Sequence, residues 1–206
     1  MKNISIVILG LLLIGCTKAV YKSKWIQETA PEHFVTRFET TKGNFDVQIN
    51  RDASPKGVDR FYQLVQHRFF DNTVFYRVVP HFVAQFGIID STETALWKEN
   101  KIPDEPVRDS NLKGAISYAR GGKETRHDHL FINLKNNQRL DTVMAGGVRG
   151  YPPFGTVIKG MDVVESLYSG YGNETMAKID SLSYIQLLQA FPKLDLIHKV
   201  YILEKK

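Results

Sequence analysis

The 206-residue sequence has a single cysteine, Cys16, and no run of five or more basic residues. One cysteine excludes a disulfide framework and a metal site made of several cysteines. The formal net charge is only +5, from 27 Lys and Arg against 22 Asp and Glu, so we expect no nucleic-acid partner. A chain that is 43% hydrophobic and 24% charged is neither a collagen, a coiled-coil rod nor wholly disordered.

The longest apolar run lies at the N-terminus. Residues 4–14 are apolar apart from Ser5 and Gly10, and Lys2 precedes them. This run is too short to span a membrane, which needs about 20 residues, but it has the length of a signal-peptide core. It ends in Leu13-Ile14-Gly15-Cys16, which resembles the lipobox of bacterial lipoproteins.

The lipobox resemblance implies cleavage before Cys16 and attachment of a lipid to the thiol of that residue. We therefore expect residues 1–15 to be a signal peptide, residues 16–33 a lipidated tether and residues 34–206 the folded domain. The protein would be anchored to a bacterial membrane in the cell envelope, on the periplasmic or extracytoplasmic face. An ordinary signal peptide with a chance cysteine near the cleavage site is the alternative.

Short apolar segments between turn residues dominate the remaining chain. Residues 34–40 and 44–49 alternate apolar and polar side chains around Thr41-Lys42-Gly43, which predicts a β-hairpin. Ser54-Pro55 predicts a helix start, with apolar residues at helical spacing up to about His67. By the same criteria we expect a loop over 102–112, strands over 74–79, 82–89, 114–119, 130–134, 154–158 and 198–203, and helices over 160–168 and 181–190. Many short strands with well-separated helices favour a mostly β fold, a closed antiparallel barrel capped by helices.

Three ordered blocks resemble the cyclophilins, which are peptidyl-prolyl cis-trans isomerases. Residues 75–87, FYRVVPHFVAQFG, are similar to the family signature. Residues 114–120 with 130–132 and, further on, 140–141, 151–155 and 160–165 are similar to the later conserved segments. The resemblance implies a closed eight-stranded antiparallel barrel capped by two helices, here with an extra C-terminal helix. It also implies a monomeric enzyme without cofactors (EC 5.2.1.8) that isomerises X-Pro bonds in proline-containing polypeptides.

The same resemblance assigns roles to individual residues. Arg77 matches the catalytic arginine, and Gln85 matches the residue that hydrogen-bonds this arginine and the substrate backbone. A planar guanidinium suits this chemistry because it can donate a hydrogen bond to the proline nitrogen when the peptide bond twists. The matching substrate-binding positions are Phe82, Val83, Ala119, Arg120, His129, Phe131, Leu140 and Tyr151.

Several positions depart from the family pattern. Tyr76 stands in place of a His beside the arginine, His129 in place of a Gln, and Tyr151 where many members have His. Arg139 replaces the Trp that the family associates with cyclosporin binding. The resemblance also implies a hydrophobic groove on the outer face of the barrel. Residues 142–150, which lie between two of the matching segments, would lengthen the rim of this groove. We expect catalysis to tolerate these changes better than inhibitor binding does.

Two other functions fit parts of the sequence. A non-catalytic peptide-binding or chaperone module would share the fold, but it would be expected to lose one of the groove residues. A metalloenzyme would use His127-Asp128-His129, which places two imidazoles on one side of an extended segment. Since catalytic zinc sites have three protein ligands, two imidazoles alone favour a solvated loop, and we expect no metal.

Overall fold

The computed structural model describes residues 21–88 and 91–205. The predicted signal peptide and Cys16 lie outside these residues, so the lipid anchor stays a prediction. Within the described ranges, none of the helices combines the length and the apolar character that a membrane span requires.

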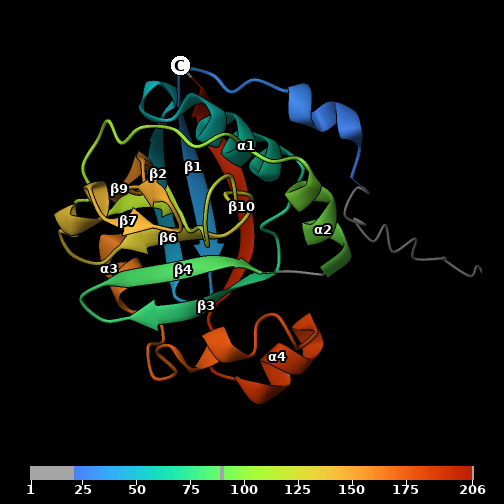
Figure 1. Cartoon of the computed structure of the whole chain (residues 1–206). Coiled ribbons are helices and arrows are strands. Elements are labelled where there is room, and N and C mark those ends of the chain that lie inside the picture. Colours follow the sequence, from blue (N-terminus) through green and yellow to red (C-terminus); the bar gives the residue numbers. More distant parts are fainter. Residues whose placement is uncertain (1–20, 89–90, 206) are drawn as a thin grey trace, which may run out of the picture.

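The described residues form a closed barrel of eight antiparallel strands in the order β1-β10-β3-β4-β6-β5-β9-β2, as predicted (Figure 1). The strands are β1 (His33–Thr40), β2 (Gly43–Asn50), β3 (Thr73–Val79), β4 (Val83–Ile88), β5 (Ala115–Tyr118), β6 (Leu130–Asn133), β9 (Pro153–Lys159) and β10 (Leu196–Lys205). A separate short hairpin joins β7 (Met144–Ala145) to β8 (Val148–Arg149). This hairpin is formed by the residues that the sequence predicted to lengthen the rim of the groove.

Aromatic side chains fill the barrel interior. Along β1 every second residue is buried, as the alternating sequence predicted. Phe38 stacks on Phe45 with ring centroids 4.6 Å apart, and Phe86 meets the edge of Phe38 at 5.6 Å. Phe75 also packs on Phe86, with ring centroids 5.3 Å apart. Because these rings occupy the interior, any binding site has to lie on the outer surface of the barrel.

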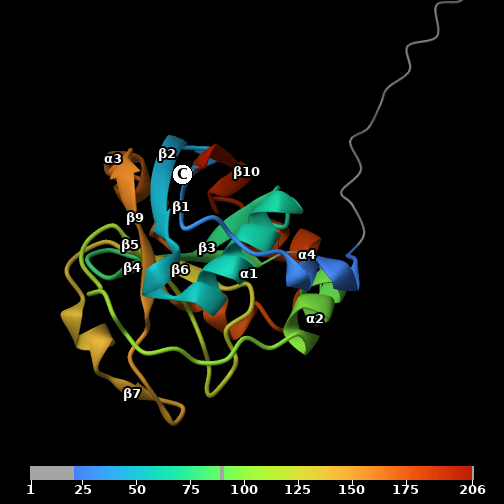
Figure 2. The ribbon, with the colours of Figure 1, turned by 90° about the horizontal axis from the view of Figure 1, so that it is seen from above.

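The described helices are α1 (Pro55–Gln66), α2 (Ser91–Glu99), α3 (Met161–Glu165) and α4 (Tyr184–Ala190). Figure 2 shows α1 lying across one end of the barrel. The predicted helix over 160–168 is shorter in the structure, and α4 is the predicted C-terminal helix, which starts with a capping box at Ser183. The sequence did not predict α2, because the apolar residues of that segment are three neighbours, 95–97, without helical spacing.

The N-terminal segment is attached to the barrel over residues 21–30. A short 3₁₀ helix, η1 (Ser23–Gln27), buries Trp25, whose ring stacks on His67 with centroids 3.7 Å apart. The backbone N–H of Ala30 donates to Asp59 on α1 at 2.9 Å. We expected residues 16–33 to be a tether, but this large aromatic anchor makes the described part of that segment belong to the folded domain.

The C-terminal segment covers the outer face of β3. Val74 and Tyr76 of this strand are buried together with Leu187 and Leu194 in a second apolar cluster. Figure 1 shows α4 lying below β3, on the side away from α1. As a result β3 is buried on both faces over its first four residues, and only its later part borders the surface.

The start of α1 is stabilised by a carboxylate from a distant loop. Glu105 accepts the backbone N–H groups of Lys56 at 2.9 Å and Gly57 at 3.1 Å. The sequence predicted Ser54 as the cap, yet its hydroxyl donates to Glu105 and so acts through that carboxylate. Arg126, whose side chain is fully buried, pairs with the same carboxylate at 3.1 Å. Burial alone would raise the pKa of the Glu105 carboxyl, but these hydrogen bonds and the charge of Arg126 hold it below its usual value.

Replacing this carboxylate should destabilise the fold. We expect Glu105→Gln to lower the free energy of unfolding at pH 7 by about 3 kcal/mol, the scale for breaking a buried ion pair. Since the pKa is lower in the folded chain, Glu105 stabilises the fold above its unfolded pKa of about 4.3, and this contribution disappears as the pH falls through the folded value. Denaturant unfolding between pH 7 and pH 3 should therefore show a shallower pH dependence in the variant.

The exposed Glu32, which pairs with Arg51 at 3.4 Å, is the matched control. Glu32→Gln should change the free energy of unfolding by less than about 0.5 kcal/mol. Equal effects of the two substitutions would contradict the assigned role of Glu105.

Candidate active site

A β-bulge in β3 determines which side chains reach the outer surface. Phe75 pairs with Phe86 of β4, but the next paired residue on β3 is Arg77, opposite Gln85. Tyr76 is the extra residue between these two pairs. Strict alternation would send Arg77 into the barrel beside Phe75, and the bulge turns it outward instead.

Arg77 therefore lies at the end of a row that crosses neighbouring strands. Gln85 of β4 is paired with Arg77 on one side and with Phe131 of β6 on the other. Phe131 is in turn paired with Ser117 of β5. Because side chains opposite each other in antiparallel strands share a face, the row brings a cation, an amide and an aromatic ring together.

Two hydrogen bonds orient the Arg77 guanidinium. Its Nη1 donates to Oε1 of Gln85 at 3.1 Å, and its Nε donates to Oδ1 of Asn173 at 2.7 Å. The guanidinium also lies over the ring of Phe82, 5.5 Å from the ring centroid. Burial lowers the pKa of Arg77, but an arginine remains charged at neutral pH. Neither hydrogen bond uses Nη2, so this amino group has donors to offer a ligand.

An apolar pocket of about 200 Å³ opens beside the guanidinium. Its lining contains the two predicted catalytic residues and every predicted substrate-binding residue except His129, namely Arg77, Phe82, Val83, Gln85, Ala119, Arg120, Phe131, Leu140 and Tyr151. Val83, Phe131 and Leu140 are each less than 10% exposed and form an apolar cluster separate from the barrel core. The ring of Tyr151 meets Phe131 edge-on with centroids 5.9 Å apart.

Comparisons with known proteins agree with this geometry. Residues 35–185 match the model of the family described as cyclophilin type peptidyl-prolyl cis-trans isomerase/CLD. The chain belongs to this family. Among its relatives is the peptidyl-prolyl cis-trans isomerase of Acinetobacter baylyi, 27% identical over 81% of this chain and 82% of that protein. Peptidyl-prolyl cis-trans isomerase A of Dickeya dadantii is 33% identical over 62% of this chain and 67% of that protein.

Solved structures share the fold. A cyclophilin-type isomerase of Cryptosporidium parvum superposes with a TM-score of 0.62 at 20% identity, covering 84% of this chain and 99% of that chain. A second structure of that protein, in the presence of the dipeptide Ala-Pro, has a TM-score of 0.60 at 20% identity, over 83% of this chain and 99% of that chain. These likenesses confirm the predicted cyclophilin barrel.

A buried network of asparagines supports the cyclophilin groove from below. Asn137 donates from Nδ2 to the backbone oxygen of Phe82 at 2.8 Å and to Oδ1 of Asn133 at 2.8 Å. Asn111, which is fully buried, donates to the backbone oxygen of Tyr151 at 2.9 Å and accepts from Asn133 at 3.1 Å. These residues were not predicted from the sequence. Their hydrogen bonds fix the backbone that carries Phe82 and Tyr151, and polar side chains of this kind are indistinguishable from loop residues in the sequence.

Arg120 holds the inserted hairpin against the groove. Its side chain is almost fully buried, and it donates to the backbone oxygens of Val148 at 3.3 Å and of Gly150. The guanidinium also lies 4.7 Å from the ring centroid of Tyr151. At the hairpin tip Gly146 has a positive φ of 57°, and a Cβ there would lie 2.4 Å from the Cα of Gly122. These contacts hold the insertion beside the groove.

His129 lies next to the groove instead of lining it. Its Nδ1 is 2.9 Å from the hydroxyl of Tyr76. Burial raises the pKa of Tyr76 well above its usual value, and a hydrogen bond with Gln85 acts in the opposite direction. The phenol is therefore protonated and shares a hydrogen bond with His129, whose own pKa burial lowers. Tyr76 and His129 border a neighbouring pocket of about 280 Å³ that shares Gln85, Ala119 and Arg120 with the groove.

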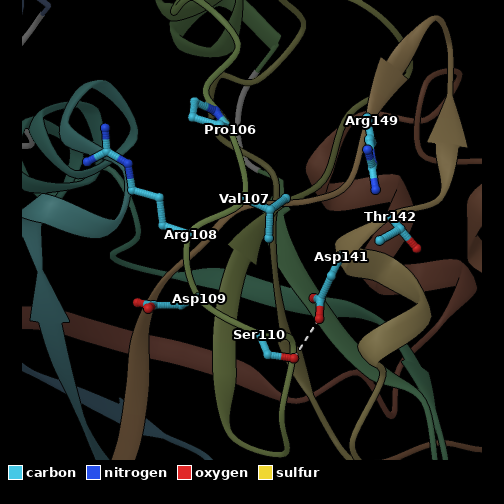
Figure 3. A pocket seen from close by; sticks show the side chains of 8 residues that line it. All are labelled: Pro106, Val107, Arg108, Asp109, Ser110, Asp141, Thr142 and Arg149. Carbon is cyan, nitrogen blue, oxygen red and sulfur yellow. Dashed lines mark hydrogen bonds between the residues drawn. The ribbon is translucent and has the colours of Figure 1, made fainter.

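A larger hollow of about 580 Å³ is lined by residues 106–110, 141–142 and 149 (Figure 3). Its central carboxylate, Asp141, accepts from Ser110 at 2.5 Å and from the backbone and side chain of Asn111. Figure 3 shows Arg108 extending away from this hollow, and its Nη1 donates to the backbone oxygen of Asp52. The polar groups of this hollow are thus already engaged in structural hydrogen bonds. The smaller apolar pocket beside Arg77 is therefore the better candidate for an active site.

Two residues outside the predicted site contribute to it. Asn173 lies 96 positions after Arg77, and no pattern in the sequence pointed to it. Arg139 is exposed, and its guanidinium lies 5.0 Å from the ring centroid of Phe82. Arg77 contacts the same ring. The position where the family often has Trp therefore places a second cation at the pocket rim.

Proposed function

We propose that this protein accelerates rotation about X-Pro peptide bonds in folding proteins of a bacterial cell envelope, where a lipid on Cys16 anchors it to the membrane. The isomerase chemistry is supported most by one observation. A guanidinium held by Gln85 and Asn173 lies at the edge of an apolar pocket of about 200 Å³. Membership of the cyclophilin family agrees with this chemistry.

The reaction requires only that the twisted peptide bond be stabilised. A peptide bond resists rotation by about 18–20 kcal/mol, and X-Pro bonds isomerise unaided in tens to hundreds of seconds. Reaching milliseconds means lowering this barrier by roughly 6–7 kcal/mol. When the bond twists, conjugation is lost and the proline nitrogen regains a lone pair. A donor aimed at this nitrogen stabilises the twisted state more than either planar state.

Arg77 is placed to be this donor. Its Nε and Nη1 are already fixed by Asn173 and Gln85, which leaves Nη2 to donate to the substrate without reorganisation. No nucleophile is needed, because no covalent bond is broken in the reaction. The partly desolvated surroundings of the guanidinium strengthen a hydrogen bond to the nitrogen relative to the same bond in water.

The proline ring would occupy the apolar pocket. Phe131 and Leu140 are buried and offer only carbon atoms to a ring, with Phe82 and Tyr151 at the edges. The structure of the Cryptosporidium relative determined in the presence of the dipeptide Ala-Pro agrees with a proline-containing ligand. Proline-containing polypeptides are therefore the proposed substrates, with Ala119 and Arg120 bordering the residue before proline.

The envelope location rests on the N-terminal sequence. A charged start, an apolar run over 4–14 and the Leu13-Ile14-Gly15-Cys16 sequence support a lipoprotein signal. Residue 21, where the described chain begins, is close to the surface helix η1, so only a short segment would separate the folded domain from a lipid on Cys16. The groove would then act on proteins near the membrane surface.

Replacing the arginine should remove most of the turnover. We expect Arg77→Ala to lower kcat/KM for an Ala-Pro-containing peptide by about 10²–10³-fold, the usual effect of removing one preorganised donor. Arg77→Lys should recover little of this loss, since an ammonium lacks the planar fork of the guanidinium. The rate can be measured by protease-coupled assay or by NMR exchange.

Arg108→Ala, which changes an arginine outside the groove, should keep the wild-type rate, and thermal unfolding should show that Arg77→Ala remains folded. Wild-type protein that binds the peptide without accelerating its isomerisation would instead support the non-catalytic peptide-binding module.

The anchor can be tested by mass. Intact-mass measurement of the protein extracted from membranes of the expressing bacterium should show a chain that starts at Cys16 and carries acyl groups. Cys16→Ser should release unlipidated protein from the membrane fraction. A mature form with an unmodified thiol would contradict the proposed anchor.

A further inference from the structure

Three consecutive residues beside the groove bring together donor atoms with metal-ligand geometry. His127, Asp128 and His129 each offer one ligand atom, and these atoms lie within 4.8 Å of one another. The two imidazole rings are nearly perpendicular, with centroids 5.4 Å apart. Two imidazoles bound to one tetrahedral metal at normal Zn–N distances have centroids about 5 Å apart. The rings therefore need little movement to share an ion.

Asp128 supplies the third donor. Its side chain is fully buried, and Oδ1 contacts Nδ1 of His127 and lies 3.6 Å from Nε2 of His129. Among residues 21–88 and 91–205, Oδ2 has no hydrogen-bond partner. A buried carboxylate with an unsatisfied oxygen is costly unless a cation or a donor compensates it. A metal ion between the two imidazoles would provide that compensation.

The backbone of β4 lies very close to the segment that carries these three residues. Gly87 of β4 has a positive φ of 120°, and a Cβ there would lie 2.0 Å from the backbone oxygen of Asp128. Only glycine therefore lets β4 lie this close to the segment that carries the cluster. On the other side the Tyr76 hydroxyl bonds Nδ1 of His129 at 2.9 Å. With Nδ1–H donating to the phenol oxygen, this bond fixes the ring and leaves the lone pair of Nε2 facing Asp128, as the outer hydrogen bonds of metal-binding histidines do.

We propose that His127, Asp128 and His129 bind a divalent transition-metal ion such as Zn²⁺, and that the bound ion modulates the proposed isomerase. Two imidazoles and a carboxylate are a donor set that suits zinc, copper and nickel. In the sequence only the two imidazoles counted as ligands, so we expected no metal; the structure adds the carboxylate. Three protein ligands leave a position open for water or another ligand.

The modulation follows from the contacts of His129. His129 is hydrogen-bonded to Tyr76, both line one pocket together with Gln85, and Gln85 accepts from Arg77. The pocket that His127 and His129 border also shares Gln85 with the groove. An ion that fixes His129 would thus act on the groups that orient the catalytic guanidinium. This part of the inference rests on the proposed function, whereas metal binding itself does not.

Calorimetric titration of the detergent-solubilised full chain with Zn²⁺ tests the site. We expect one equivalent to bind with a Kd in the micromolar range or below, and His127→Gln and Asp128→Asn each to weaken binding by about tenfold or more. His198→Gln, at an exposed histidine of β10, should leave the affinity unchanged. Absence of binding, or equal binding by all four proteins, would overturn the site.

His127 is partly exposed, so its variant keeps the test valid if Asp128→Asn does not fold. Because calorimetry needs no turnover, an inactive protein that binds zinc would contradict the isomerase proposal alone. In an active protein, saturating Zn²⁺ should lower the isomerisation rate by about twofold or more in wild type and leave His127→Gln unaffected. Binding without a change in rate would overturn the modulation.

Discussion

The extra residue in β3 is the constraint on which the outer face of the barrel depends. Without the bulge at Tyr76, the two-residue period of the strand would bury Arg77 among the aromatic rings of the interior. A lone guanidinium there would have a large desolvation cost and no paired charge. The bulge instead pairs Arg77 with Gln85 at the surface, and the row continues to Phe131 on the next strand.

A bulge leaves backbone groups outside the regular ladder, and the C-terminal segment compensates for this. Thr175 donates from its hydroxyl to the backbone oxygen of Tyr76. Two residues earlier, Asn173 accepts from Nε of Arg77. One segment thus satisfies the bulged backbone and orients the side chain that the bulge exposes. The apolar cluster around Leu187 attaches this segment to β3, so the packing of α4 is linked to the geometry of the proposed active site.

Alternating apolar residues were sufficient to predict much of the barrel. The hairpin of β1 and β2, α1 and the later strands follow from local periodicity, and the resemblance to cyclophilins placed nine of the ten predicted site residues around one pocket. Periodicity alone would have placed Arg77 inside, because a bulge is not visible in a two-residue pattern. Asn173 could not be identified from the sequence either, since its contact with Arg77 spans 96 positions.

Features that leave no periodic signal in the sequence were not predicted. The segment around Trp25 was not assigned to the domain, and α2 was not predicted as a helix, because both segments have too few apolar residues for a periodic signal. Aromatic contacts nevertheless bury both Trp25 and Trp97. Asp128 was not counted as a ligand in the sequence, and adjacent residues of an extended strand point to opposite faces. The chain bends at residues 127 and 128, so the carboxylate and the imidazoles converge.

The most direct test of the account is a double-mutant cycle between the two residues that the bulge brings together. The values of kcat/KM for wild type, Arg77→Ala, Gln85→Ala and the double variant give the coupling free energy of the pair. If Gln85 acts by orienting Arg77, the double variant should be about as slow as Arg77→Ala alone. Additive losses would mean that the two side chains act independently, and would contradict a site organised around their hydrogen bond.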